Sequence, residues 1–325
     1  MGLTPRFGRW VVAHAPATSA NLGPGFDALG LALDWREAVR CALVGHEGLE
    51  VRASGPGAGQ VPRDEGNLAV RAARRVLAAA GVPRVGLRVH LHLVLPVGRG
   101  LGSSAAAVAA GLVAANRLLD DPLSLDDLLA LGTDIEGHPD NVAPALLGGF
   151  CAACIASEGA AGAPARRVLA VRLAPPPLAA VVAIPDRPLP THLARQALPG
   201  QVPFADAVAN VQRTALLVAG VAAGRMDVLR EATQDRLHQP YRAGLVPGLA
   251  DCLRGALDAG ALGAFLSGAG PSVLALVPRD GPAPDAVARA LRAGVRAAGG
   301  GEVRRLELAA RGAWAEPADG PAGDA

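Results

Sequence analysis

Residues 96–116, PVGRGLGSSAAAVAAGLVAAN, place a glycine-rich turn between the end of a strand and the start of a helix. The three glycines let the backbone approach a ligand closely. The unpaired N–H groups of a helix that begins at Ser103 favour a bound anion, and the Ser104 hydroxyl is an oxygen ligand of the kind that Mg²⁺ prefers. The stretch therefore predicts a phosphate-binding turn. A turn capped by Ser103 and built only for close helix packing explains the same residues equally well.

Two common phosphate-binding motifs are absent from this stretch. It lacks the GxxxxGK[ST] pattern of a P-loop, and no βαβ unit with a ribose-binding acid follows it, as a dinucleotide fold requires. The chain contains no lysine, so its 31 Lys and Arg residues are all arginines. The composition excludes Schiff-base catalysis and any phosphate site that depends on a lysine.

The spacing of apolar residues along the chain predicts strands and helices in alternation. Strands are expected at 10–16, 29–39, 85–96, 179–185 and 302–309, helices at 67–81, 103–119, 124–137, 204–224 and 284–299, and a strand–turn–strand unit at 262–278. Ser124 is the expected N-cap of its helix. The order indicates an α+β protein with a surface insertion at about 158–165 and a polar tail that is disordered from about Ala313.

The length and composition suit a globular chain of two domains. Of 325 residues, 51% are hydrophobic and 18% are charged, and this length usually exceeds a single core. The net charge of +2 argues against a nucleic-acid or membrane-surface partner. Because we find neither a long apolar run nor a secretory signal, we expect a cytoplasmic protein without a membrane span.

Cys151 and Cys154 form a lone CxxC pair. A zinc site would need two more soft ligands at similar spacing. Two residues three apart on a strand point to opposite faces, and we interpret both as small buried side chains and not as metal ligands.

Three further stretches combine turn residues with polar groups. In residues 15–33, APATSANLGPGFDALGLAL, Asn21 and Asp27 could orient a polar ligand, although both residue types also suit turns. Residues 134–149, DIEGHPDNVAPALLGG, hold four polar groups. Burying such groups costs free energy, so their presence before an apolar run indicates a functional role. These four are Glu136, His138, Asp140 and Asn141. Residues 266–276, LSGAGPSVLAL, predict either an anion-binding nest or a tight hairpin turn.

Three of these stretches together resemble the signature motifs of the GHMP family of small-molecule kinases, which includes galactokinases and mevalonate kinases. They are ANLGPGFDALGLAL, PVGRGLGSSAA and LSGAGPSVLAL, in that order. Residues 136–149, EGHPDNVAPALLGG, and residues 237–242, LHQPYR, are most similar to the family members that phosphorylate the hydroxyl of L-homoserine in threonine biosynthesis.

The resemblance implies a two-domain α+β fold. The N-terminal domain is expected to be similar to domain 2 of ribosomal protein S5, with a left-handed βαβ crossover, and the C-terminal domain to be ferredoxin-like. We place an ATP-binding domain at 1–170, a second domain at 171–312 and a disordered tail at 313–325. The active site is expected in the cleft between the two domains.

The resemblance also implies roles for individual residues. ATP is expected to contact Asn67, near the adenine, and Pro96, Val97, Gly98, Arg99, Gly100, Leu101, Gly102, Ser103, Ser104, Ala105 and Ala106 around the phosphates. Mg²⁺ is expected at Ser104 and Glu136. The substrate L-homoserine is expected among Asn21, Asp27, His138, Asp140, Asn141, Arg195 and Arg242. The two arginines would hold its carboxylate, because a planar guanidinium can bind a carboxylate through two hydrogen bonds.

Catalysis is expected to depend on Asn21, Asp27 and Asn141. Phosphoryl transfer needs in-line geometry and charge neutralisation more than covalent help. The resemblance to mevalonate kinases would imply an aspartate base near the position that Asn141 occupies in this chain. Because Asn141 carries an amide, it cannot take the proton. We expect neither Asp27 nor Asp140 to be a strong base, so that the hydroxyl proton passes to the phosphate or to water.

Two alternative functions are compatible with the same motifs. The first is a kinase of the same family that acts on a different small alcohol, and the second is a non-catalytic ligand-binding member of the fold. Homodimerisation is compatible with both.

Overall fold

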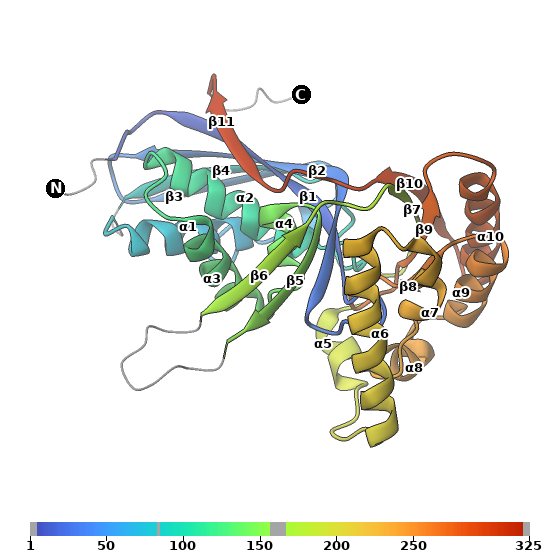
Figure 1. The fold of residues 1–325 in the computed structure, drawn as a ribbon. Helices are drawn as coiled ribbons and strands as arrows, with labels where there is room; N and C mark the ends of the chain where they lie inside the picture. The colour runs from blue at the N-terminus through green and yellow to red at the C-terminus, as the bar shows by residue number, and fades with distance from the viewer. Residues whose placement is uncertain (1–4, 83–84, 157–166, 321–325) are drawn as a thin grey trace.

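The computed structural model describes residues 5–82, 85–156 and 167–320. The insertion predicted at 158–165 lies outside the described residues. The chain folds into two β-sheets with helices packed against them, which confirms the α+β prediction (Figure 1). In the described part of the chain, no helix combines the length and the apolar character that a membrane span requires.

The first sheet contains most of the strands from the N-terminal half of the chain. Its strands are β1 (Trp10–Ala20), β2 (Leu29–Val44), β3 (Leu49–Ser54), β4 (Gly86–His92), β5 (Phe150–Ile155), β6 (Val168–Leu173) and β11 (Trp314–Ala318). The order is β11-β1-β2-β4-β3, and β5 pairs with both β2 and β6. The strands β3 and β4 run parallel and are joined through helix α1, which makes the predicted βαβ unit.

Four helices pack with this first sheet. They are α1 (Leu68–Ala79), α2 (Ser103–Leu118), α3 (Leu125–Glu136) and α4 (Val142–Leu147). Helix α2 packs against β1, β2 and α1, and a Cβ atom at Gly111 would lie 2.4 Å from the carbonyl oxygen of Ala69 in α1. The small residues of α2 thus allow two helix backbones to approach closely. Helix α3 begins at Ser124 as predicted, because Ser124 and Asp127 form a capping box.

The second sheet consists of β7 (Leu178–Pro185), β8 (Gly263–Leu266), β9 (Val273–Pro278) and β10 (Gly301–Glu307), in the order β10-β7-β9-β8. All neighbouring strands in it are antiparallel. Helices α9 (Leu249–Asp258) and α10 (Ala283–Ala297) pack on each other and on this sheet. This is the ferredoxin-like arrangement that the family resemblance implied.

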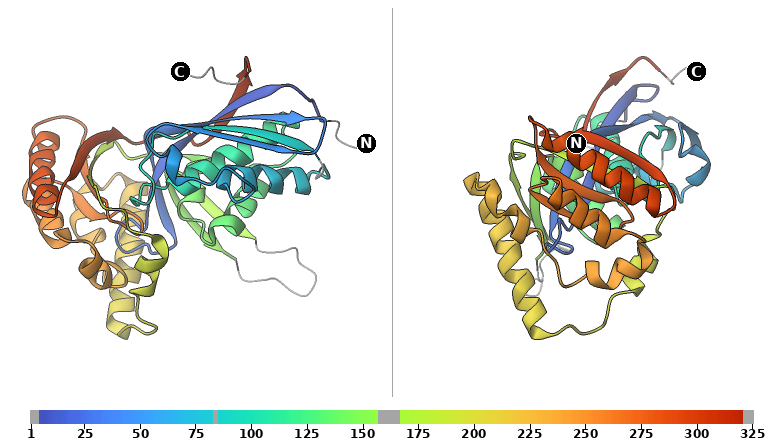
Figure 2. Two further views of the ribbon diagram at one scale, coloured as in Figure 1. Left: turned by 180° about the vertical axis from the view of Figure 1, so that it is seen from behind. Right: turned by 90° about the vertical axis from the view of Figure 1, so that its right-hand side faces the viewer.

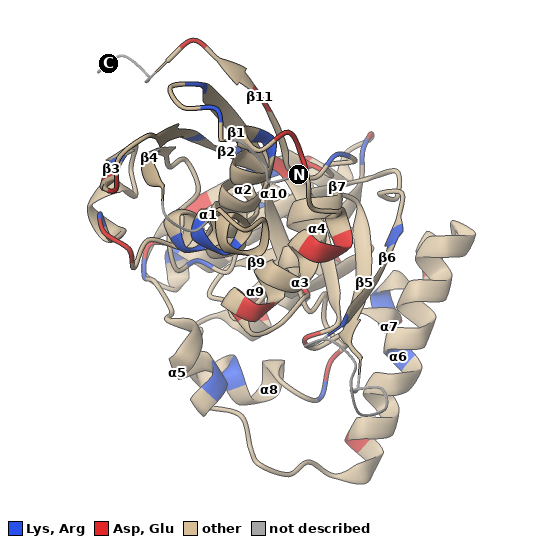
Figure 3. Cartoon of the chain, turned by 90° about the vertical axis from the view of Figure 1, so that its left-hand side faces the viewer, with Lys and Arg blue, Asp and Glu red and all other residues tan. Residues whose placement is uncertain are grey.

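The remaining helices lie between β7 and α9 in the sequence. They are α5 (Thr191–Gln196), α6 (Phe204–Ala223), α7 (Leu229–Ala232) and α8 (Gln239–Arg242), with short 3₁₀ segments at Met226–Val228 and Ala243–Leu245. A further 3₁₀ segment, Ala58–Gln60, lies between β3 and α1. The long helix α6 stands along one side of the molecule (Figure 2). Acidic and basic residues are interspersed in the view of Figure 3, in keeping with the small net charge.

The predicted disordered tail is wrong over residues 314–318, which form strand β11. This strand pairs antiparallel with β1, so the chain returns to the first sheet after the second is complete (Figure 1). Trp314 stacks on His14 with ring centroids 5.0 Å apart, and the Arg36 guanidinium lies 4.7 Å from the Trp314 ring centroid. The free edge of β1 and these ring contacts order a segment whose composition is typical of a loop. Residues 321–325 lie outside the described residues.

The chain passes from the first sheet to the second between Leu173 and Leu178. The boundary proposed at 170/171 therefore falls inside β6. In the neighbouring strand β5, Cys151 is buried and Cys154 is exposed. The prediction that both side chains are buried is wrong for Cys154, because it lies on the opposite face of the strand, which is open to solvent.

Candidate active site

A cavity of about 430 Å³ lies where residues of both halves of the chain meet. It is lined by most of the residues that the sequence singled out: Asn21, Asp27, Asn67, every residue from Pro96 to Ser104, Glu136, His138, Asp140, Asn141, Arg195 and Arg242. Ala105 and Ala106 are exceptions, because both are fully buried in the core below α2. Their side chains therefore do not face the cavity, and the expected contact with ATP would have to come from their backbone.

Residues 96–102 form a tight turn, which we call the phosphate turn. Gly102 has a φ angle of +65°, and a Cβ atom there would lie 1.8 Å from Oγ1 of Thr18. Gly100 has a φ angle of +74°, and a Cβ atom there would lie 2.3 Å from the carbonyl oxygen of Ser267. Both positions need glycine for conformation and for space. The phosphate turn is thus held closely between β1 and the loop that follows β8.

Hydrogen bonds to the second half of the chain fix the phosphate turn further. The Ser267 hydroxyl bonds to the Gly100 carbonyl oxygen at 2.6 Å and to the Ser19 hydroxyl at 2.8 Å. Arg99 donates from Nε to the carbonyl oxygen of Pro185 at 2.8 Å, and from Nη2 to the carbonyl oxygen of Asp186. The turn is therefore held in shape by contacts within the chain itself.

Helix α2 starts directly after the phosphate turn, and its first two residues, Ser103 and Ser104, line the cavity. No side chain of the described residues caps this 16-residue helix at its N-terminus. Its first N–H groups and the positive end of its dipole are consequently available to an anion.

Ser104 and Glu136 bring two oxygen ligands together at the cavity wall. The Ser104 hydroxyl donates to Oε2 of Glu136 at 2.8 Å. Burial raises the pKa of Glu136, and the hydrogen bond from Ser104 opposes this rise only in part. A nearby cation would stabilise the ionised form of Glu136. A hydroxyl and a carboxylate together are oxygen ligands of the kind that fits Mg²⁺.

Residues 21–27, which we call the substrate loop, adopt an unusual backbone conformation. Asn21, Leu22 and Asp27 all have positive φ angles, of 68°, 50° and 56°. Such conformations are costly for residues other than glycine and are concentrated at functional sites. The Asn21 side chain stabilises the loop, because Oδ1 accepts from the Asp27 N–H at 3.0 Å and Nδ2 donates to the Gly268 carbonyl oxygen at 2.9 Å.

Two arginines from the second half of the chain face the substrate loop. Arg195 donates from Nη1 and Nη2 to the two carboxylate oxygens of Asp27, at 3.0 and 2.7 Å. Arg242 is 1% exposed and donates to the carbonyl oxygens of Ala194 and Gly268. The guanidinium groups lie 5.7 and 5.4 Å from the ring centroid of Phe26. Burial, followed by the charge of Arg195, lowers the pKa of Arg242 to about 10, so both arginines are cations at neutral pH.

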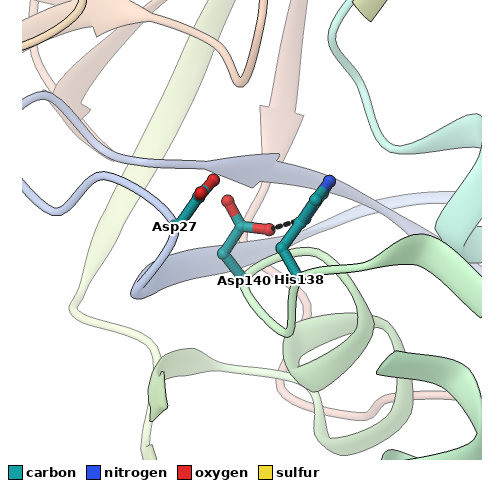
Figure 4. Close-up of side chains that lie close together, drawn as sticks. All are labelled: Asp27, His138 and Asp140. Atoms are coloured by element: carbon teal, nitrogen blue, oxygen red, sulfur yellow. Dashed lines mark hydrogen bonds and ion pairs between the residues drawn. The ribbon is translucent and has the colours of Figure 1, made fainter. Parts of the chain in front are cut away.

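His138 and Asp140 lie opposite Asp27. Nδ1 of His138 is 2.5 Å from Oδ1 of Asp140, and the three side chains place ligand atoms within 4.8 Å of one another (Figure 4). Burial lowers the pKa of His138, but the hydrogen bond to Asp140 and its charge outweigh burial and raise the pKa overall. Asn141 accepts from the Thr18 hydroxyl at 2.8 Å. The group is suited to bind a small cation such as an ammonium group or a metal ion.

Asn67 lines the cavity, but its polar atoms are already used. Its Oδ1 accepts from the N–H groups of Ala69 and Val70 as the N-cap of α1, and its Nδ2 donates to the Pro62 carbonyl oxygen at 2.8 Å. Its proposed contact with adenine would therefore be indirect, through the position of Pro62.

Several lining residues were missed by sequence reasoning. They are Phe26, Gln60, Val61, Pro62, Leu91, Leu93 and Thr191, whereas Gly268 and Ala269, which also line the cavity, belong to the turn predicted at 266–276. Phe26 stood inside the quoted motif and carried a signal, because it is the aromatic residue of a loop otherwise made of small and polar residues. The residues at 60–62, 91 and 93 carried none, since each is an ordinary loop or strand residue.

Comparisons with known proteins show which family the chain is similar to. Residues 67–149 match the family description "GHMP kinases N terminal domain" and residues 217–297 match "GHMP kinases C terminal". A homoserine kinase of Synechococcus sp. (strain CC9605) is 45% identical over 320 residues, which is 97% of this chain and 98% of the relative. A homoserine kinase of Moorella thermoacetica is 45% identical over 277 residues, which is 84% of this chain and 90% of the relative.

A solved structure is similar over nearly the whole chain. The crystal structure of homoserine kinase from Cytophaga hutchinsonii has a TM-score of 0.85 and 32% sequence identity, and the match covers 96% of this chain and 99% of that one.

Proposed function

This chain belongs to the GHMP kinase family, and from that premise we propose that it transfers the γ-phosphate of ATP to the side-chain hydroxyl of L-homoserine, the step that makes O-phospho-L-homoserine for threonine biosynthesis. The geometric observation that carries the proposal is a single cavity with an anion site at one wall and a paired carboxylate and guanidinium at another. A nucleotide and a zwitterionic amino acid would need both.

ATP would bind with its phosphates at the phosphate turn and the N-terminus of α2. The hydrogen bond from Ser267 to the Gly100 carbonyl oxygen holds the backbone there, and the helix dipole supplies positive potential where the chain has no lysine. The apolar wall of Val61, Leu91 and Leu93 suits the base. Rigid positioning lowers the entropy cost of holding the reacting groups in line.

The amino acid would bind between the substrate loop and the two arginines. Its carboxylate suits Arg195 and Arg242, and its ammonium group suits Asp27 and Asp140. Its hydroxyl end would then lie toward α2, near Asn141, which lines the cavity and accepts from the Thr18 hydroxyl. Serine, with one methylene fewer, would place its hydroxyl less well.

Mg²⁺ would be held by Ser104 and Glu136, where it would neutralise phosphate charge during transfer. The chain's own residues supply position rather than a base. Both oxygens of Asp27 already accept from Arg195, and Oδ1 of Asp140 is shared with His138 and Asn141. We therefore propose that the hydroxyl proton passes to the phosphate or to water.

The experiment that tests this function is ADP release from the purified chain with Mg·ATP. L-homoserine is compared with L-serine, L-threonine and mevalonate at equal concentration. We expect turnover that strongly prefers L-homoserine. Faster turnover with another alcohol would leave the phosphate site in place and overturn the substrate. ATP binding without turnover would favour the non-catalytic alternative.

The cellular location and the oligomeric state of the enzyme stay predictions. We propose that the enzyme acts in the cytoplasm, where it would draw on ATP, and that two copies associate. Light scattering of the purified chain over a range of concentrations measures the association.

A further inference from the structure

Glu37, in the middle of β2, has no role in the site described above and is completely buried. Its Oε1 atom lies 3.5 Å from the Ser103 hydroxyl, and its Oε2 atom has no hydrogen-bond partner among the described residues. The backbone N–H of Leu95 is the other polar group that faces the carboxyl. A buried carboxyl group with one free oxygen is costly, so its presence needs a reason.

The two groups that contact Glu37 stand at the two ends of the phosphate turn. Leu95 is the last residue before the turn, and Ser103 is the first residue of α2 after it. We propose that Glu37 is a positioning residue that joins both ends of the phosphate turn from below, and that ATP binds well only while Glu37 keeps its proton. This inference rests on the proposed use of ATP.

The surroundings of Glu37 keep it uncharged. Its partner on β1 is Ala15, and Val39 and Cys41 follow at alternate positions of β2. Burial raises the pKa of Glu37 to about 8, and the bonds from Leu95 and Ser103 oppose that rise only in part. At neutral pH the carboxyl is therefore mostly protonated, and the unpartnered Oε2 can carry the proton.

The charged and titratable groups of the neighbouring elements do not offset the raised pKa of Glu37. On β2, burial raises the pKa of the Cys41 thiol to about 12, so this group is uncharged as well. His14 of β1 and His92 of β4 are each paired with Ala38, the neighbour of Glu37, and so project from the other face. From α3, Glu136 reaches Ser104, beside Ser103. Within the described ranges, no charged group contributes to the pKa shift of Glu37.

The consequence for ATP follows from charge. A protonated Glu37 adds no negative charge below the triphosphate, whereas an ionised Glu37 would repel it across a medium of low dielectric constant. Bound ATP in turn raises the pKa of Glu37 further. The affinity for ATP should therefore be constant below the pKa of the free protein and fall as the pH rises through about 8.

The test is calorimetric binding of Mg·ATP, without an acceptor alcohol, between pH 7 and 9.5. For the native chain we expect Kd to rise about tenfold per pH unit above pH 8, with uptake of close to one proton per ATP. Glu37→Gln keeps the shape and removes the charge, so its Kd should stay flat across the same range. Glu37→Ala loses both contacts and should bind ATP about two- to tenfold more weakly at pH 7.

Val39→Ala is the matched control, because Val39 is also completely buried on the same face of β2 but contacts neither end of the turn in this way. It should retain the pH profile of the native chain even if it unfolds more readily. Parallel profiles in the native chain and in Glu37→Gln would overturn the inference while leaving the ATP site intact. Failure of the native chain to bind Mg·ATP at any pH would overturn the proposed function, and the inference with it.

Discussion

Arg195 of α5 binds both carboxylate oxygens of Asp27 in the substrate loop, at 3.0 and 2.7 Å, and so joins residues 168 positions apart in the sequence. Both side chains are about one-third exposed to the cavity. The hydrogen bond to Asp27 raises the pKa of Arg195, and the charge of Asp27 adds to this rise, although burial opposes it. A zwitterionic substrate can replace this pair with two new ones, its carboxylate on Arg195 and its ammonium group on Asp27.

Arg195→Lys should raise KM for L-homoserine about 10- to 100-fold and leave KM for ATP unchanged. The reason is that a lysine cannot make the two parallel hydrogen bonds of a guanidinium, and a hydrogen bond to a charged group is worth about 1.5–3 kcal/mol. Steady-state kinetics with each substrate varied in turn measures both constants. Arg225→Lys is the control, because Arg225 also binds an aspartate, Asp227, through two hydrogen bonds but on the exposed surface.

Asp27→Asn separates a binding role from a catalytic base. We expect mainly a higher KM for L-homoserine, since the amide keeps the size of the side chain and loses the charge that faces the ammonium group. A fall in kcat of about 10²–10⁴-fold, the range of general-base catalysis, would instead identify Asp27 as the base. Asp140→Asn, measured alongside, tests the other carboxyl in the same way.

Glu136→Gln should raise the Mg²⁺ concentration needed for half-maximal activity by about tenfold or more. The variant keeps the hydrogen bond to Ser104 but loses the negative charge that attracts the ion. Titration of activity with Mg²⁺ at fixed ATP measures the effect. Asp134→Asn, on the same helix but exposed, should behave like the native chain. If Glu136→Gln and Asp134→Asn depend equally on the Mg²⁺ concentration, the ion does not bind at Glu136.

Gly102→Ala should destabilise the protein by at least about 2 kcal/mol and weaken ATP binding. Its φ angle of +65° is unfavourable for alanine, and the new Cβ atom would meet Thr18. Gly224→Ala is the matched control. Gly224 has a φ angle of +69°, and a Cβ atom there would have no neighbouring atom of the described residues within 4 Å, so the conformational cost of about 1 kcal/mol should act alone. Urea unfolding of both variants gives the comparison.

Glu37→Gln should stabilise the protein, increasingly so as the pH rises from about 4.5 to about 8. In the unfolded chain Glu37 ionises near its ordinary pKa of 4.5, whereas in the folded chain it stays protonated up to about 8. Between these values the unfolded state binds fewer protons, so the native chain loses stability with rising pH, in total on the order of 5 kcal/mol. Above pH 8 the difference should be constant. A difference that does not change with pH would show that Glu37 ionises normally in the fold.

Much of the fold was readable from local patterns. The helix capped by Ser124 has its own capping residues, and the placement of Cys151 and Cys154 on opposite faces required nothing beyond strand geometry. The tail was read wrongly because residues 314–318 have little strand propensity of their own. They are ordered by the open edge of β1 and by contacts of Trp314, which a local pattern does not contain.

The candidate site also contains residues that the sequence identified correctly and residues whose surroundings only the fold revealed. Glycine spacing and the family motifs were sufficient to name the phosphate turn, the substrate loop, Arg195 and Arg242 as site residues. Ala105 and Ala106 belonged to the same motif, yet the turn of the helix directs their side chains into the core. Asn67 was named for a ligand, but its polar atoms cap α1.

Sequence alone thus settled which segments carry chemistry, because glycine, capping and charge requirements act over a few neighbouring residues. Only the tertiary structure decided which charges meet and which lose their water. Asp27 pairs with Arg195 because α5 folds back over the substrate loop, and Glu37 looks like any polar strand residue until β1, β2 and α2 close around it. Desolvation and long-range pairing depend on the whole fold, and these set the electrostatics on which binding of ATP and substrate would depend.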